Sequence, residues 1–188
     1  MCGRYVFRWE AHALDWERLD TVVKEKYPDE TIPEGEIFPG YTMPVFVRGK
    51  VKADVKLMKW GYEGFSKGST IINARAETVF TKNLFSDDII SRRCAVPANG
   101  FYEWSHDTEK TKYLFSLEDS NMIFMAGIYN INNRFSILTT SANDSMISVH
   151  TRMPVILARN ELLRWLGDDE YAARVLKRTG PELSKSLV

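Results

Sequence analysis

The fold class is decided by the stretch from Cys94 to Thr140, which has the sequence CAVPANGFYEWSHDTEKTKYLFSLEDSNMIFMAGIYNINNRFSILTT. Short apolar, β-branched and aromatic runs alternate in it with polar turns such as residues 118–121. This pattern predicts strands over Cys94–Pro97, Gly100–Trp104, Tyr113–Leu117, Met122–Tyr129 and Phe135–Thr140. Because the runs are short and closely spaced, we expect an antiparallel, strongly bent sheet or barrel.

A hairpin is expected upstream, between residues 45 and 57. Val47, Val51, Val55 and Leu57 share one parity of this segment, and the other parity is mostly basic. Alternation with a period of two is typical of a half-buried strand, and the turn is expected around Gly49-Lys50.

Helical periodicity is confined to the flanks of these strands. Residues 10–27 place Ala13, Trp16, Leu19, Val23 and Tyr27 on one stripe, and Pro28 ends the pattern. Further helical patterns lie near residues 78–90, 143–149, 160–166 and 168–177. No regular βαβ alternation appears, so the predicted class is α+β, with a predominantly antiparallel, barrel-like β core and peripheral helices.

The chain organisation is predicted to be simple. The 188 residues contain no repeat or linker, so we expect one domain over residues 1–188, with the motifs in 1–157 and a charged helical segment over 158–188. No apolar run is long enough to span a membrane, the N-terminus lacks the apolar core of a signal peptide, and two cysteines cannot form a disulfide framework. We therefore expect a cytoplasmic protein without membrane contact.

The net charge is zero, with 25 Lys and Arg against 25 Asp and Glu. This balance argues against a protein that binds nucleic acid by bulk charge. The acidic residues are concentrated between residues 10 and 30, however, whereas many basic residues lie in the hairpin and in the motifs described below. A neutral chain can therefore present a locally basic surface.

Cys2 is informative because of its position beside Met1. A small second residue permits removal of the initiator methionine, which would leave a free α-amine beside the thiol. Both groups titrate near about 8 in model peptides, so each keeps a nucleophilic fraction at neutral pH. Such an aminothiol condenses with an aldehyde to an imine, on which the thiol closes a stable thiazolidine ring. Alternatively, Cys2 is an incidental small residue near the chain end.

Two further clusters contain polar groups that could take part in binding or catalysis. Asn73 could hydrogen-bond a substrate oxygen and Arg75 suits bidentate phosphate contact, although a turn residue and an ion pair with Glu77 would explain them equally well. Glu103 lies among aromatic residues, where burial raises a carboxyl pKa toward the range of acid-base catalysis. A structural Glu–Arg pair is the alternative there, and Cys94 nearby is expected in the core.

His150 is the third candidate, because an imidazole can donate or accept a proton near neutral pH. A histidine beside Arg152 can also be purely structural. The upstream Asn143 or Asp144 is expected to cap a short helix. Motifs for nucleotide phosphates, zinc proteases and lipases are absent from the sequence, and the histidines and cysteines lack metal-ligand spacing, so no metal site is expected.

Several stretches, in this order, resemble the SOS-response-associated peptidase (SRAP) family, the abasic-site processing proteins. They are the MCGRY start, Trp60-Gly61, INARAET over 72–78, RCAVPANGFYEW over 93–104, TTSAND over 139–144 and HTRMPVIL over 150–157. The resemblance implies a β-rich α+β domain that binds single-stranded DNA and covalently traps the aldehyde of an abasic site. It implies no metal or organic cofactor.

The resemblance also implies roles for the candidate residues. Cys2, freed of Met1, would form the thiazolidine with the ring-opened sugar, and Asn73 would orient the chain end and the sugar. Glu103 would act as general acid-base and assist removal of Met1. His150 would handle the sugar hydroxyl proton, and an imine would also permit a lyase side reaction. The residues expected to contact DNA are Arg4, Pro39, Trp60, Arg75 and Arg152.

The chain departs from the family pattern at two places. Residues 36–40 are Glu-Ile-Phe-Pro-Gly where relatives have N-[IV]-A-P-T, so only Pro39 matches and DNA contacts in that loop are uncertain on sequence grounds. Thr151 replaces the acidic or amide residue that often follows the motif histidine.

Two other functions are consistent with the sequence. One is an amide hydrolase with an N-terminal cysteine nucleophile, and the other is a non-catalytic single-stranded DNA-binding module. The expected partner is single-stranded DNA with abasic sites, bound by a monomer that associates with the nucleoid at damage. The sequence does not show whether the replication machinery recruits the protein.

Overall fold

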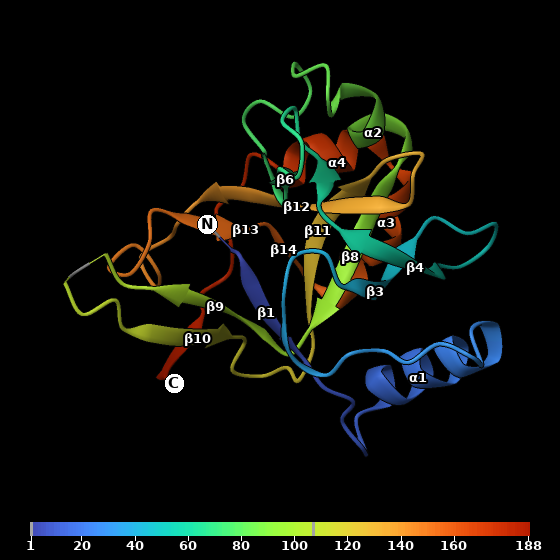
Figure 1. Cartoon of the computed structure of the whole chain (residues 1–188), viewed down its shortest axis with the longest axis horizontal. Coiled ribbons are helices and arrows are strands. Elements are labelled where there is room, and N and C mark those ends of the chain that lie inside the picture. The colour runs from blue at the N-terminus through green and yellow to red at the C-terminus, as the bar shows by residue number, and fades with distance from the viewer. Residues whose placement is uncertain (1, 107) are drawn as a thin grey trace.

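The computed structural model, drawn in Figure 1, describes residues 2–106 and 108–188. Met1, whose removal the sequence predicts, and Asp107 lie outside the described residues. One sheet, called here the β1 sheet, has the strand order β15-β10-β9-β1-β2. Its strands are β1 (Arg4–Phe7), β2 (Gly35–Ile37), β9 (Gly100–Trp104), β10 (Lys112–Ser116) and β15 (Ser184–Leu187).

A second sheet, called here the β12 sheet, has the order β13-β12-β4-β3-β8-β11-β14, with β7 also paired to β12. Because β11 pairs with β12 as well, the strands from β12 through β4, β3, β8 and β11 close into a ring. Its strands are β3 (Thr42–Val47), β4 (Asp54–Trp60), β7 (Asn73–Arg75), β8 (Arg93–Ala98), β11 (Ile123–Tyr129), β12 (Arg134–Ser141), β13 (Arg152–Pro154) and β14 (Ile156–Leu157). The predicted α+β class with a bent, mostly antiparallel core is confirmed.

The predicted hairpin is present, since β3 and β4 pair antiparallel from Thr42 to Val47. Its turn occupies residues 48–53, and Val51, predicted on the apolar face, is 95% exposed there. A small pair of strands, β5 (Tyr62–Glu63) and β6 (Thr70–Ile71), follows β4.

The helices lie outside the sheets (Figure 1). α1 (Leu14–Lys26) buries Trp16, Leu19 and Val23, as the stripe predicts, and packs on β4. The others are α2 (Ser86–Ser91), the short 3-10 turn η1 (Arg159–Glu161), α3 (Leu162–Gly167) and α4 (Asp169–Val175). None of the helices in residues 2–106 and 108–188 is long and apolar enough to cross a membrane.

Two helix predictions are wrong in extent. Residues 78–85 form successive hydrogen-bonded turns, and the helix begins only at Ser86. Residues 143–149 likewise form turns rather than a helix, and Asn143 does not act as the expected cap. Its amide donates instead to the carbonyls of Gly180 and Pro181, at 3.1 and 2.6 Å, so a tertiary contact outweighs the local cap.

The segment 158–188 is not wholly helical, because β15 adds to the edge of β10 with Tyr113 opposite Leu187. The hydrogen bonds of an available strand edge outweigh the weak helical tendency of the last residues. The end of the chain is thereby part of the β1 sheet.

Apolar side chains between the sheets and under the helices form one core cluster. The inner face of the β1 sheet contributes Tyr5, Phe7, Ile37, Phe101 and Phe115, all with 0% exposure. Since strand side chains alternate, Arg4 and Tyr102 point to the opposite, outer face. The start of β1 therefore has one face in the core, and its other face has the partly exposed Arg4 beside Val6 and Tyr102, which are 5% and 7% exposed.

Candidate active site

Cys2 lies directly before β1, and β1 is hydrogen-bonded on both edges, to β2 and to β9. The residue has no exposed surface, and its sulfur lies 3.8 Å from the carbonyl oxygen of Arg4. Burial raises the pKa of the thiol, and the charge of Glu103 raises it further. The strand thus holds a protonated thiol at a defined position inside the protein.

Asn73 fixes the same segment from the other sheet. It begins β7, which lies parallel to β12 with Asn73 opposite Ile137. Its side-chain amide donates a 2.9 Å hydrogen bond to the carbonyl oxygen of Cys2. Its Oδ1 is buried and accepts no hydrogen bond from the described residues. Cys2 therefore lies where the two sheets meet, next to an acceptor available for a ligand.

Glu103 approaches Cys2 from β9. The antiparallel register pairs Arg4 with Tyr102, so one further step places Glu103 opposite Gly3. Its side chain shares the inner face with Phe101 and is 3% exposed. Burial raises the pKa of the carboxyl above its ordinary value. A buried carboxyl beside the thiol is suited to proton transfer.

His150 lies just before β13, and its Nδ1 accepts a 2.9 Å hydrogen bond from the main-chain N–H of Arg152. The neutral ring therefore has its proton on Nε2. Burial, with a contribution from His106, lowers the pKa of His150 to about 4. His106 follows β9, and the centroids of the two imidazole rings are 4.8 Å apart.

The fold thus brings Cys2, Asn73 and Glu103 together from three segments, and His150 joins them through His106, which lies near Glu103. The sequence analysis did not single out His106 as a site residue. Its position three residues after Glu103 was the available signal, since β9 continues toward the chain end that holds Cys2. The structure adds it to the site through the contact with His150.

The predicted phosphate ligands have different environments. Arg75 is exposed, and its side chain has no ion pair or hydrogen bond within the described residues. Arg152, in contrast, is bound by Glu77 at two points, one of them 2.9 Å, and donates to the carbonyl oxygen of Thr139 at 2.6 Å. This pairing lowers the pKa of Glu77. Arg75 is available to a phosphate, whereas Arg152 is engaged in the fold.

Arg4 is also engaged. Its Nε lies 3.6 Å from Glu36, and its guanidinium is 4.0 Å from the centroid of the Phe38 ring. Glu36 lies on β2 and Phe38 in the turn after it, both within residues 36–40, the loop of the family pattern from which this chain departs. The loop therefore contacts a predicted DNA ligand directly, two residues from Cys2.

Pro39 occupies a tight turn between β2 and β3. The N–H of Tyr41 donates to the carbonyl of Phe38 at 3.1 Å, and Gly40 has a φ of +93°. Proline followed by glycine with positive φ is the pattern of a type II turn. The turn exposes the rings of Phe38 and Tyr41, at 37% and 40%, with centroids 5.8 Å apart. This exposed aromatic pair, flanking Pro39, was missed by sequence reasoning.

Trp60 supports that turn from inside. The tryptophan is 0% exposed, and its indole N–H donates to the carbonyl of Ile72 at 3.1 Å. Its main-chain carbonyl accepts a hydrogen bond from the N–H of Gly40 at 2.8 Å, and its main-chain N–H donates to the carbonyl of Tyr41 at 2.9 Å. A base cannot stack on a ring without an exposed face, so the structure does not support the predicted contact of Trp60 with DNA.

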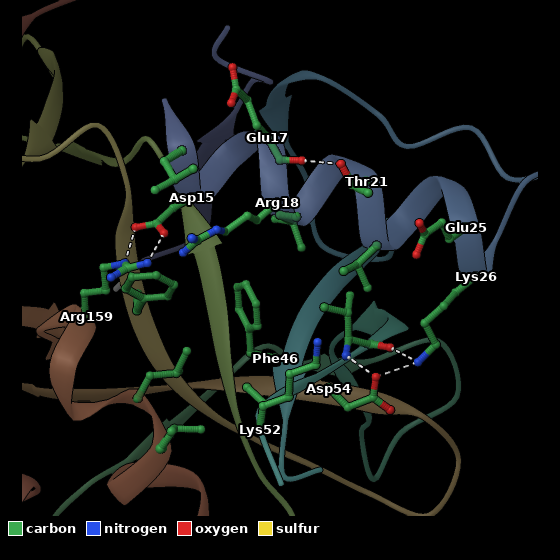
Figure 2. A pocket seen from close by; sticks show the side chains of 18 residues that line it. Asp15, Glu17, Arg18, Thr21, Glu25, Lys26, Phe46, Lys52, Asp54 and Arg159 are labelled. Carbon is green, nitrogen blue, oxygen red and sulfur yellow. Dashed lines mark hydrogen bonds and ion pairs between the residues drawn. The ribbon is translucent and has the colours of Figure 1, made fainter. Parts of the chain in front are cut away.

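No group of three or more potential metal ligands is found in the described parts of the chain. A groove of about 1040 Å³ lies between α1 and the β3–β4 hairpin, and it contains none of the predicted site residues. Figure 2 shows two ion pairs among its lining residues, Asp15 with Arg159 and Lys26 with Asp54, the latter at 2.7 Å. The groove is separate from the thiol site.

The architecture and the site define a class of β-rich α+β protein in which the first strand presents a cysteine at the junction of two sheets. The chain belongs to the SOS response associated peptidase (SRAP) family, whose model matches residues 1–186. The resemblance inferred from the motifs is thereby confirmed.

Similar proteins include the abasic site processing protein YoqW of Bacillus subtilis, 30% identical over all of this chain and 86% of that protein. The abasic site processing protein YedK of Escherichia coli is 26% identical, over 88% of this chain and 79% of its own. A crystal structure of a protein from Bacteroides thetaiotaomicron has the same fold, with a TM-score of 0.79 and 23% identity over all of this chain and 92% of that one. The family is therefore one of abasic site processing proteins.

Proposed function

We propose that this protein captures abasic sites in single-stranded DNA through a covalent thiazolidine link to Cys2, after removal of Met1. The observation that supports this most directly is that Asn73 and Glu103 both meet Cys2 at the junction of the two sheets, with His150 linked to Glu103 through His106. Each supplies a group that the reaction needs.

The first step opens the sugar. An abasic deoxyribose is mainly a cyclic hemiacetal, and opening moves the C1′ hydroxyl proton away while the ring oxygen O4′ gains one. The C1′ hydroxyl proton passes to water and O4′ takes one up from water, while the Nε2–H of neutral His150 is suited to hydrogen-bond O4′ as it does so. Asn73 Oδ1 offers an acceptor for a sugar hydroxyl.

The second step joins protein and DNA. The α-amine of Cys2 adds to the C1′ aldehyde, and the resulting carbinolamine loses water to give an imine. Glu103, with its raised pKa, can protonate the departing hydroxyl. The thiol then adds across the imine, so that a sulfur–carbon bond forms and the thiol proton passes to nitrogen. No oxidant or cofactor is required by this balance.

Two other activities follow from the same groups. The imine acidifies the C2′ hydrogen, so elimination of the 3′ phosphate competes with ring closure as a lyase reaction. The same carboxyl, Glu103, would assist hydrolysis of the Met1–Cys2 peptide bond. Arg75 and the exposed pair Phe38 and Tyr41 would hold flanking phosphates and bases.

The test is intact mass spectrometry of the protein incubated with a single-stranded oligonucleotide that has one abasic site. We expect an adduct of protein plus oligonucleotide minus water, which Cys2→Ser abolishes and Cys94→Ala retains. Cys94 is the matched control because it is also a buried thiol with a raised pKa. An unmodified mass for protein that has lost Met1 would overturn the proposal, and binding without adduct would indicate a non-catalytic DNA-binding module.

The lyase branch has a separate signature. Serine at position 2 keeps the amine but lacks the thiol that closes the ring. We therefore expect Cys2→Ser, once processed, to convert adduct formation into strand cleavage at the abasic site, visible on a denaturing gel.

A further inference from the structure

Glu36 connects two cations on the outer face of the β1 sheet. Its carboxylate lies 2.7 Å from the Nζ of Lys112 on β10 and 3.6 Å from the Nε of Arg4 on β1. The side chains are only partly exposed, at 29% for Glu36, 23% for Lys112 and 32% for Arg4. Partial burial makes such a network stronger than an ordinary surface pair.

Both cations also lie over the faces of aromatic rings. Arg4 is 4.0 Å from the centroid of Phe38, and Lys112 is 4.0 Å from that of Tyr102 and 5.5 Å from that of Trp104. The strand registers pair Arg4 with Tyr102 and Lys112 with Trp104, so these groups share the face opposite the core. Tyr102 is only 7% exposed and lies beneath Lys112, so the rings that the outer face offers to bases beside the two cations are Phe38, at 37%, and the partly exposed Trp104.

Cations interleaved with aromatic rings form the surface that binds single-stranded nucleic acid, through phosphate contacts and base stacking. This surface begins at Arg4, two residues from Cys2, so a strand attached there can pass directly onto it. The carboxylate of Glu36, however, occupies the two cations that phosphates would contact.

We propose that Glu36 acts as a built-in competitor of DNA phosphate for Arg4 and Lys112, and so limits binding of undamaged single-stranded DNA. The proposal rests on the proposed function, because it concerns the surface that receives the strand captured at Cys2. It assigns to Glu36, on β2, a specificity role within residues 36–40, where this chain differs from the family pattern.

The physical effect is a contrast between damaged and undamaged DNA. A phosphate that approaches Arg4 or Lys112 meets the carboxylate as a like charge, which weakens every encounter. A covalent bond to an abasic sugar is unaffected by that repulsion once formed. Weak reversible binding with durable capture favours abasic DNA over the large excess of intact strands.

The test compares wild type with Glu36→Gln on an intact oligo-dT probe by fluorescence anisotropy over a range of salt. Glutamine keeps the shape and a hydrogen-bond acceptor for Lys112 but removes the charge. We expect roughly fivefold tighter binding at low salt. The slope of log affinity against log salt should become steeper by about 0.7 for each cation released.

Two variants make the test specific. Asp20→Asn changes the net charge equally and frees Lys24 on α1, so it controls for bulk charge. Lys112→Gln should weaken binding more in the Glu36→Gln background than in wild type. An unchanged affinity and slope for Glu36→Gln, or an equal gain from Asp20→Asn, would overturn the proposal. Failure of wild type to form an adduct with abasic DNA would instead refute the proposed function, because the oligo-dT comparison involves no covalent step.

Discussion

The side-chain amide of Asn73 hydrogen-bonds the main-chain carbonyl of Cys2 at 2.9 Å, across 71 residues of sequence. This bond ties the segment before β1 to β7, and thereby ties the β1 sheet to the β12 sheet. Because the Oδ1 of the same side chain stays available within the described structure, Asn73 can hold the chain end and contact a sugar together.

Asn73→Ala should slow adduct formation far more than it reduces stability. Loss of one such bond lowers the free energy of unfolding by about 1 kcal/mol, or roughly 2–4 °C in Tm. Asn143→Ala is the control, since it removes an asparagine bonded to main-chain carbonyls away from Cys2. Calorimetry should show similar Tm losses, and only Asn73→Ala should lower the crosslinking rate. Equal rates in the two variants would contradict the positioning role.

Glu103→Gln should slow crosslinking by roughly 100-fold or more in protein that has lost Met1, because proton transfer to the departing hydroxyl is lost. N-terminal mass analysis should also show retained Met1. Burial raises the pKa of Glu103, so its ionised form is disfavoured in the fold. The stability of wild type relative to Glu103→Gln should therefore be greatest at acid pH and fall as pH rises above the ordinary value of 4.5. Thermal melts from pH 4 to 8 measure this difference.

His150 should take up its second proton near pH 4 rather than near its ordinary value of 6.5, so its charge should not change over the neutral range in which crosslinking is measured. The lowered pKa also means that His150 favours the folded state least in acid, with stability lost as pH falls from 6.5 through 4. NMR titration of the His150 ring measures the pKa directly. Burial is a larger cause of the lowered pKa of His150 than the charge of His106. His106→Gln should therefore raise the pKa of His150 only part of the way to 6.5, and a full return to 6.5 would show that His106 is the main cause.

Arg75 and Arg152 should differ in what their removal changes. Arg75→Gln should weaken binding of single-stranded DNA several-fold and flatten the salt slope by about 0.7, with an unchanged Tm. Arg152→Gln should lower the Tm, because it leaves Glu77 without its two-point partner. The lowered pKa of Glu77 stabilises the fold above its ordinary value of 4.5, so this loss should shrink as pH falls below that value.

Trp60→Phe should reduce stability by about 1–3 kcal/mol, since a buried hydrogen bond and buried volume are lost, without changing DNA affinity. Phe38→Leu should do the reverse, because an exposed ring that stacks on bases contributes to binding and little to the core. Anisotropy and thermal melts on the two variants separate these effects. Weaker DNA binding by folded Trp60→Phe would restore the role predicted from sequence.

The local pattern of the chain predicts its strands well and its chain ends less well. Gly100–Trp104 agrees with β9 to the residue, because alternation and turn residues act locally there. Ser184–Leu187 becomes a strand only because β10 offers an edge, and residues 143–149 lack a helix because Asn143 hydrogen-bonds the carbonyls of Gly180 and Pro181. Contacts with segments far away in the sequence cannot be predicted from a local pattern.

The candidate site shows the same division. The residue types and order predict Cys2, Asn73, Glu103 and His150 through the family resemblance, and the fold brings their segments together. Exposure is not predictable in that way, since the motif residue Trp60 is buried while Phe38, outside the motifs, is exposed. The ion-pair partner of an arginine is equally unpredictable from sequence, because only the fold shows that Glu77 pairs with Arg152.

The position of β1 between β2 and β9 has a mechanical consequence. Tension applied to a DNA strand joined at Cys2 would pull β1 along its own axis. The hydrogen bonds on both of its edges lie across that direction, so they share the force in shear instead of opening one after another. A pull on a strand attached as proposed would therefore be opposed by the cooperative strength of the sheet before Cys2 is drawn out.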